Sequence, residues 1–228
     1  MFTSEAKMTM PVIQWMESLG LQVKSEFITP WGMCDLVGLS FKKGARTARL
    51  KLGQTQPISS LIGAALLAEI PDAKTRKTTT LRHLTQKCFP AISEEIVEEQ
   101  VRRLIADRFV MSPRANRLQK LNGWVPLHKK LVAIELKLSR IEEALSQARN
   151  NLIFADKSFV GLPKDMAERV AASKTRRSSF LNAGIGLVSV SFRECKIVIP
   201  SRPSSSRPDP VIQFYCVEKF WRTHSRGS

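Results

Sequence analysis

The chain has 228 residues, and its 36 lysines and arginines against 20 aspartates and glutamates give a formal net charge of +16 at pH 7. An apolar fraction of 43% is ordinary for a globular protein and excludes a disordered basic tail as the whole molecule. No apolar run reaches the roughly 18 residues of a membrane span, and the N-terminus lacks the pattern of a secretory signal, so we expect a cytoplasmic protein, nucleoid-associated if bacterial, with no membrane contact.

The first part of the chain is predicted to form one helix and three strands. Residues 11–19 carry an apolar stripe at helical spacing, with Pro11 in the first turn and Gly20 just past the end. Polar and apolar residues alternate over 21–27, and basic and apolar residues alternate over 46–52, which predicts two strands. Residues 34–41 are predicted to form a strand between them, bounded by turns at Pro30–Gly32 and Lys42–Gly44.

A helical insert is predicted over residues 54–125. Helices are expected at 58–70, 78–88 and 93–109, followed by a short hairpin at 109–121. The third helix is amphipathic, and its expected buried stripe consists of Ile96, Val97, Val101, Leu104 and Ile105. Three helices closed by a hairpin are typical of a winged helix-turn-helix.

Strands and helices alternate again after the insert. The pattern predicts a strand, a long helix, a strand, a helix and two short strands, at 130–138, 140–155, 158–162, 164–173, 187–191 and 196–199. A serine- and proline-rich linker follows at 201–210, and residues 211–217 are expected to form another strand or to dock on a partner.

These patterns predict three regions. Residues 1–53 and 126–200 would form one discontinuous α/β core, residues 54–125 the insert, and residues 201–228 a basic C-terminal segment. Four scattered cysteines and three scattered histidines show no zinc spacing, and we expect buried reduced thiols.

Three charged residues stand out on apolar strands. Asp35 begins the predicted strand at 34–41, while Glu135 and Lys137 are two apart on the strand at 130–138 and therefore share one face. Because charge is costly to bury, the pair is expected to line a cleft or hold a cation. The alternatives are a strand-capping Asp35 and a salt-bridged pair on a solvated sheet face.

The chemistry of these groups fits phosphodiester hydrolysis. An aspartate and a glutamate on adjacent strands can hold Mg²⁺ through oxygen atoms, and the metal activates a bound water. A neighbouring lysine can orient that water or stabilise developing charge.

The spacing of these residues resembles the PD-(D/E)XK nuclease superfamily, which has a restriction-endonuclease-like fold. The similarity rests on Asp35 at a strand start, on Glu135-Leu-Lys137 in an apolar strand, and on the long helix that follows. It covers about residues 10–52 and 128–200. Cys34 stands where a proline often precedes the aspartate, and the insert accounts for the long spacing between the two acids.

The resemblance implies roles for individual residues. Asp35, Glu135 and the main-chain carbonyl of Leu136 would bind Mg²⁺ or Mn²⁺, and Lys137 would be the catalytic lysine. Gln147 would contact the site from the helix, although a solvent-facing glutamine is the alternative. An additional acid is expected at Glu26 in preference to Glu17, against the alternative of a solvent-facing Glu26.

The positive charge makes nucleic acid the expected partner, with DNA favoured over RNA. The residues expected to contact it are Lys42, Lys43, Arg46, Arg49, Arg76, Lys77, Arg114, Arg117, Lys120, Arg176 and Arg177. Acidic residues at the start of the third insert helix argue against base reading by that helix and leave a protein contact as its alternative. Dimers are common in this fold, so the resemblance also suggests a homodimer.

Two classes of function follow. The first is a Mg²⁺-dependent nuclease with a restriction-endonuclease-like mixed sheet, flanked by helices, and an inserted winged helix-turn-helix. The second is a non-catalytic nucleic-acid-binding or regulatory protein that keeps the nuclease-like scaffold.

Overall fold

The structure is a computed structural model that describes residues 2–121, 126–202 and 208–224. The chain divides into two compact units. The first comprises Met1–Ser40 and His128–Asp209, and the second comprises Phe41–Leu127 and Pro210–Ser228. The predicted insert at 54–125 lies within the second unit. No helix in the described ranges has the length and apolarity needed to cross a membrane.

A mixed six-stranded sheet forms the centre of the first unit. Its strand order is β1-β2-β5-β6-β7-β8, and β5, β6 and β7 pair in parallel while the hairpin pairs β1·β2 and β7·β8 are antiparallel. The strands span Gln22–Thr29, Gly32–Phe41, His128–Leu136, Lys157–Pro163, Gly186–Val190 and Cys195–Ile199, in the order β1, β2, β5, β6, β7, β8. The expected α/β class with a mixed sheet flanked by helices is confirmed.

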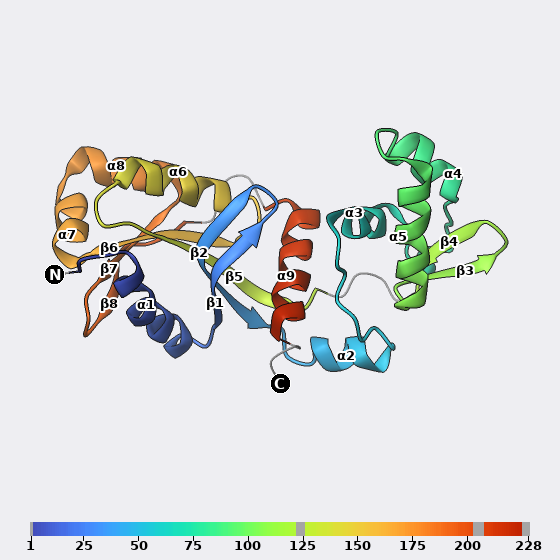
Figure 1. The fold of residues 1–228 in the computed structure, drawn as a ribbon, viewed down its shortest axis with the longest axis horizontal. Coiled ribbons are helices and arrows are strands. Elements are labelled where there is room, and N and C mark those ends of the chain that lie inside the picture. The colour runs from blue at the N-terminus through green and yellow to red at the C-terminus, as the bar shows by residue number, and fades with distance from the viewer. Residues whose placement is uncertain (1, 122–125, 203–207, 225–228) are drawn as a thin grey trace. The chain divides into compact units, whose positions relative to one another are not determined.

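Helices cover both faces of this sheet, as Figure 1 shows. Helix α1 (Ala6–Ser18) packs on one face, in a core cluster that includes Phe159 and Val188. The opposite face carries α6 (Ile141–Asn151), α7 (Lys164–Ala172) and α8 (Lys174–Ala183), in a cluster that includes Val160 and Leu187. Consecutive residues of β6 and β7 thus enter different clusters, as strand geometry requires.

The second unit contains short helices, a two-stranded hairpin and the C-terminal helix. The elements are α2 (Ala45–Lys51), α3 (Leu61–Glu69), a 3₁₀ turn η1 (Ala73–Thr75), α4 (Leu81–His83), a π-helical turn η2 (Leu84–Cys88), α5 (Glu94–Ala106), β3 (Val110–Arg114), β4 (Arg117–Lys120) and α9 (Pro210–His224). Apolar side chains from α3, η2, α5, the β3–β4 hairpin and α9 form one core, to which α9 contributes Phe214.

A buried ion pair joins α2 to α9 in the second unit. Two guanidinium nitrogens of Arg49 lie 2.6 and 3.1 Å from the two carboxylate oxygens of Glu218, and both side chains are at most 1% exposed. The guanidinium carbon lies 4.6 Å from the ring centroid of Phe109 and 5.0 Å from that of Trp221. Glu218 also accepts the Ile58 N–H at 3.0 Å, so the two buried charges are paired. The Nε atom of Arg49 is buried without a hydrogen-bond partner within the described residues.

Three predictions about this part of the chain are wrong. The expected strand at 46–52 is helix α2, because Ala45 and Arg49, four positions apart, both turn into the core. The expected strand at 211–217 is part of α9. Arg49 was expected to contact nucleic acid, but its charge is buried and bound to Glu218.

Smaller differences concern the ends and faces of helices. Helix α1 starts at Ala6, so Pro11 lies inside it and removes one backbone donor. In α5, Val97, Val101 and Leu104 are buried as expected, but Ile96 and Ile105 are 46% and 39% exposed. Helix α8 was not predicted, because its apolar residues form no amphipathic stripe.

The Arg49–Glu218 pair yields a stability prediction. Replacing either residue with Ala leaves an uncompensated buried charge and should lower the free energy of unfolding by about 3–5 kcal/mol. The double variant Arg49→Leu/Glu218→Leu should lose less than either single variant, measured by chemical denaturation. Glu99→Ala, which removes an exposed partner of Arg102 and Arg103, is the control and should cost less than about 1 kcal/mol. Equal losses at the buried and exposed pairs would contradict the assignment.

Candidate functional site

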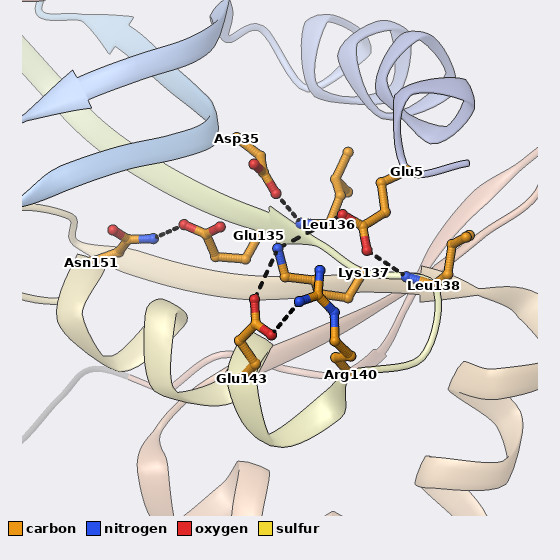
Figure 2. Close-up of polar contacts among 9 residues, drawn as sticks. All are labelled: Glu5, Asp35, Glu135, Leu136, Lys137, Leu138, Arg140, Glu143 and Asn151. Atoms are coloured by element: carbon orange, nitrogen blue, oxygen red, sulfur yellow. Dashed lines mark hydrogen bonds and ion pairs between the residues drawn. The ribbon is translucent and has the colours of Figure 1, made fainter.

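Asp35 and Glu135 meet because β2 and β5 are neighbours in the sheet. The Asp35 Oδ2 atom accepts the backbone N–H of Leu136 at 2.7 Å, although the two residues are 101 positions apart in the chain. Figure 2 shows Asp35, Glu135 and Lys137 gathered at the end of β5. The sheet therefore brings together the three residues singled out in the sequence.

The Glu135 carboxylate is buried, with 2% of the residue exposed. Its Oε1 atom accepts a hydrogen bond of 2.6 Å from the Asn151 amide, and the same amide nitrogen lies 3.5 Å from the Cys34 sulfur. Burial raises the pKa of Glu135 to about 7, the charge of Asp35 adds to the rise, and the Asn151 hydrogen bond opposes it. Burial and the charge of Glu135 also raise the pKa of the Cys34 thiol.

Lys137 follows β5 and is 6% exposed. Its amine lies 3.8 Å from an oxygen of Glu5 and 3.8 Å from an oxygen of Glu143. These acids have further partners, because Glu143 contacts Arg140 at 2.8 Å and Glu5 accepts the Leu138 N–H at 3.2 Å. Since Glu135 and Lys137 are both buried, the alternative of a solvated sheet face is wrong.

One face of α6 points toward these groups. Glu143, Gln147 and Asn151 are four positions apart and therefore line the same side of the helix. Glu143 reaches Lys137 and Asn151 reaches Glu135. Gln147, the residue expected to contact the site, lies between them, and its Oε1 atom is buried with no hydrogen-bond partner within the described residues. The same spacing in the sequence could have identified Glu143 and Asn151, which were missed.

A cavity of about 390 Å³ lies beside Asp35 in the first unit. Glu5, Glu26, Asp35 and Leu136 are among its lining residues. Glu26 is exposed and has a φ of +51°, an uncommon conformation for a residue other than glycine. Glu17 is exposed on α1 and does not line this cavity. Glu5 was missed because it precedes the predicted start of its helix.

The two carboxylates have the donor chemistry that a hard cation requires. Asp35 uses Oδ2 for Leu136 and Glu135 uses Oε1 for Asn151, so a cation would take the second oxygen of each. Positive charge there would also favour the ionised form of Glu135, whose pKa is raised by burial and, to a smaller extent, by the charge of Asp35. Within the described residues, no three or more His, Cys, Asp or Glu side chains are already grouped to hold a metal.

Apart from Arg49 and Lys120, the basic residues expected to contact nucleic acid are exposed. Most of those in the second unit are exposed, namely Lys42, Lys43, Arg46, Arg76, Lys77, Arg114 and Arg117. Lys120 is half-buried, and its amine lies 3.5 Å from the Ala68 carbonyl oxygen. Arg176 and Arg177 are exposed on α8 in the first unit.

Comparisons with known proteins find one distant structural similarity. No family model and no curated protein match the chain. Among solved structures, it is similar to the SPO1766 protein of unknown function from Silicibacter pomeroyi, with a TM-score of 0.44 and 12% sequence identity over 95% of this chain and 82% of that one.

The environment of Glu135 predicts a pH dependence of stability. The pKa of Glu135 is raised from 4.5 to about 7 in the folded protein. Between these pH values the folded protein therefore binds a proton that the unfolded chain has released. The free energy of unfolding consequently falls as the pH rises from 4.5 toward 7. Glu135→Gln removes this loss. Its stability relative to the parent protein should increase by up to about 3 kcal/mol across that range, measured by denaturation in EDTA. Glu142→Gln, on the exposed side of α6, should show no such trend, and a pH-independent difference for Glu135→Gln would contradict the prediction.

Proposed function

We propose that the protein is a metal-dependent nuclease that hydrolyses phosphodiester bonds of nucleic acid, with DNA favoured over RNA. The proposal rests on the proximity of Asp35, Glu135 and Lys137 where β2 and β5 lie side by side. The Asp35 carboxylate accepts a hydrogen bond from the backbone N–H of Leu136, the residue between Glu135 and Lys137. A sheet that only had to be stable would gain nothing from burying a carboxylate and an amine there.

Each residue of this group has a proposed role. Asp35, Glu135 and the carbonyl of Leu136 would supply oxygen ligands to Mg²⁺ or Mn²⁺, as the donor set permits. The metal, when bound, would polarise the phosphoryl oxygen and lower the pKa of a water. The Lys137 amine would orient the attacking water and offset the negative charge that grows on the phosphoryl oxygens.

Neighbouring residues would keep these groups in place. Asn151 holds one oxygen of Glu135, while Glu5 and Glu143 hold the Lys137 amine from two sides. The buried and unpartnered Oε1 atom of Gln147 is a candidate acceptor for a water at the site. Of the acids considered for an additional ligand, Glu5 and Glu26 both line the cavity beside Asp35.

The finer fold belongs to the same proposal. The strand order with β2 and β5 in adjacent positions, α1 on one face and α6 on the other is compatible with a restriction-endonuclease-like fold. The helices and the β3–β4 hairpin of the second unit are compatible with a winged helix-turn-helix.

A non-catalytic nucleic-acid-binding or regulatory protein on a nuclease-like scaffold is the second candidate. One observation favours it, namely that no described group of three or more potential ligands is arranged for a metal. Catalytic variants and metal binding separate the two candidates.

Cleavage assays test the catalytic roles. Asp35→Asn, Glu135→Gln and Lys137→Met should each reduce Mg²⁺-dependent cleavage of labelled DNA or RNA at least about 100-fold, because each removes a group that acts on the reacting atoms. Binding in EDTA should persist. Glu142→Gln and Lys164→Met change exposed residues of α6 and α7 and should leave cleavage intact. If no substrate is cleaved with Mg²⁺ or Mn²⁺ and the three variants match the parent, the scaffold candidate is favoured.

Metal binding can be tested without activity. Crystals soaked in Mn²⁺ should show anomalous density between the carboxylates of Asp35 and Glu135, because these oxygens form the proposed ligand pair. The density should disappear in Asp35→Asn crystals. An empty site in the parent protein, with Lys137 still paired to Glu5 and Glu143, would rule out the metal centre.

A further inference from the structure

A second cavity, of about 490 Å³, lies entirely within the second unit. Its lining residues come from the segment at η1 and from the β3–β4 hairpin, and they are Ala73, Arg76, Thr78, Pro113, Arg114, Arg117 and Gln119. We call this cavity the arginine pocket. Three of the seven lining residues are arginines, and none of the seven is acidic.

The three arginines of the arginine pocket lie close together with no acidic residue in the pocket lining. Arg114 and Arg117 are directly opposite each other in the hairpin, an arrangement in which like charges destabilise the strand pair. Arg76 has a φ of +58°, which is uncommon for a side-chain-bearing residue. Within the described part of the chain, none of the three guanidinium groups forms an ion pair or a side-chain hydrogen bond. These exposed guanidinium groups can therefore bind an anion from outside the chain.

The chemistry of the pocket favours a phosphate. Guanidinium groups present planar pairs of N–H donors that match phosphate oxygens. Thr78 also lines the pocket, whereas the Gln119 amide nitrogen is already bonded to the Lys77 carbonyl at 2.7 Å. An internal phosphodiester offers one charge and two free oxygens, but a phosphate monoester offers nearly two charges and three oxygens. Three arginines in one concave pocket match the monoester better.

We propose that the arginine pocket binds the terminal phosphate monoester of a nucleic-acid strand. This inference rests on the part of the proposed function that makes nucleic acid the partner, and it does not depend on cleavage. The pocket thereby defines a substrate class, strands that carry an end phosphate, and the second unit recognises that end without metal.

The test compares three versions of one labelled oligonucleotide, with a 5′-phosphate, a 3′-phosphate or hydroxyl groups at both ends. Fluorescence anisotropy in EDTA should show roughly tenfold tighter binding of at least one phosphorylated version. Inorganic phosphate should compete with that version. Arg114→Ala and Arg117→Ala should each abolish the preference, whereas Arg82→Ala should preserve it, because Arg82 is an exposed arginine of the same unit that does not line the pocket.

Thermal unfolding of the variants keeps the result interpretable. Removing one member of the Arg114–Arg117 pair relieves repulsion, so the melting temperature should stay equal or rise. Equal affinity for all three oligonucleotides, or a preference that survives both arginine variants, would overturn the proposal in favour of internal backbone contacts. A preference for the phosphorylated end without any Mg²⁺-dependent cleavage would support the pocket proposal and reject the nuclease proposal. Cleavage without the preference would support the nuclease proposal and reject the pocket proposal.

Discussion

The first unit depends on the burial of one carboxylate, that of Glu135, in the buried half of β5, whose other residues at 131–136 are apolar. Loss of hydration disfavours the charged form of Glu135, and the nearby charge of Asp35 adds repulsion. Together they raise the pKa of Glu135 to about 7. The amide of Asn151 compensates in part. A group held at such a cost on a central strand is typical of a functional site, where stability is exchanged for chemistry.

Charged and polar neighbours surround the buried carboxylate of Glu135. Lys137 brings positive charge near the same strand end, where Glu5, just before α1, and Glu143, on α6, lie close to its amine. Asp35 is fixed by the backbone N–H of Leu136 and so cannot turn away from Glu135 without losing a hydrogen bond. A divalent cation would satisfy both carboxylates at once, which is the physical basis for proposing a metal-dependent hydrolase.

The arginines of the second unit lie in two contrasting environments. Arg49 is buried, paired with Glu218 and packed between two aromatic rings, so its charge serves the fold. Arg76, Arg114 and Arg117 surround an open pocket that lacks acidic residues, so their charges remain available to a ligand. The net charge of +16 therefore includes buried charges such as that of Arg49, which stabilise the fold, and exposed charges. Only the exposed charges can contact a binding partner.

The α/β class, the strands that carry Asp35 and Glu135, and the helix that carries Gln147 were predictable from the sequence alone, because strand and helix periodicities are local properties. The predicted strand at 130–138 ran past Leu136, where β5 ends, so Lys137 lies just after the strand. The sequence alone did not determine residues 46–52, where alternating basic and apolar residues fit either period. Only the tertiary structure decided for a helix, since Glu218, the partner of Arg49, lies 169 positions away. The i, i+4 spacing with Gln147 places Glu143 and Asn151 on the same side of α6. Their contacts with Lys137 and Glu135, and the contact of Glu5 with Lys137, come from tertiary packing against the sheet.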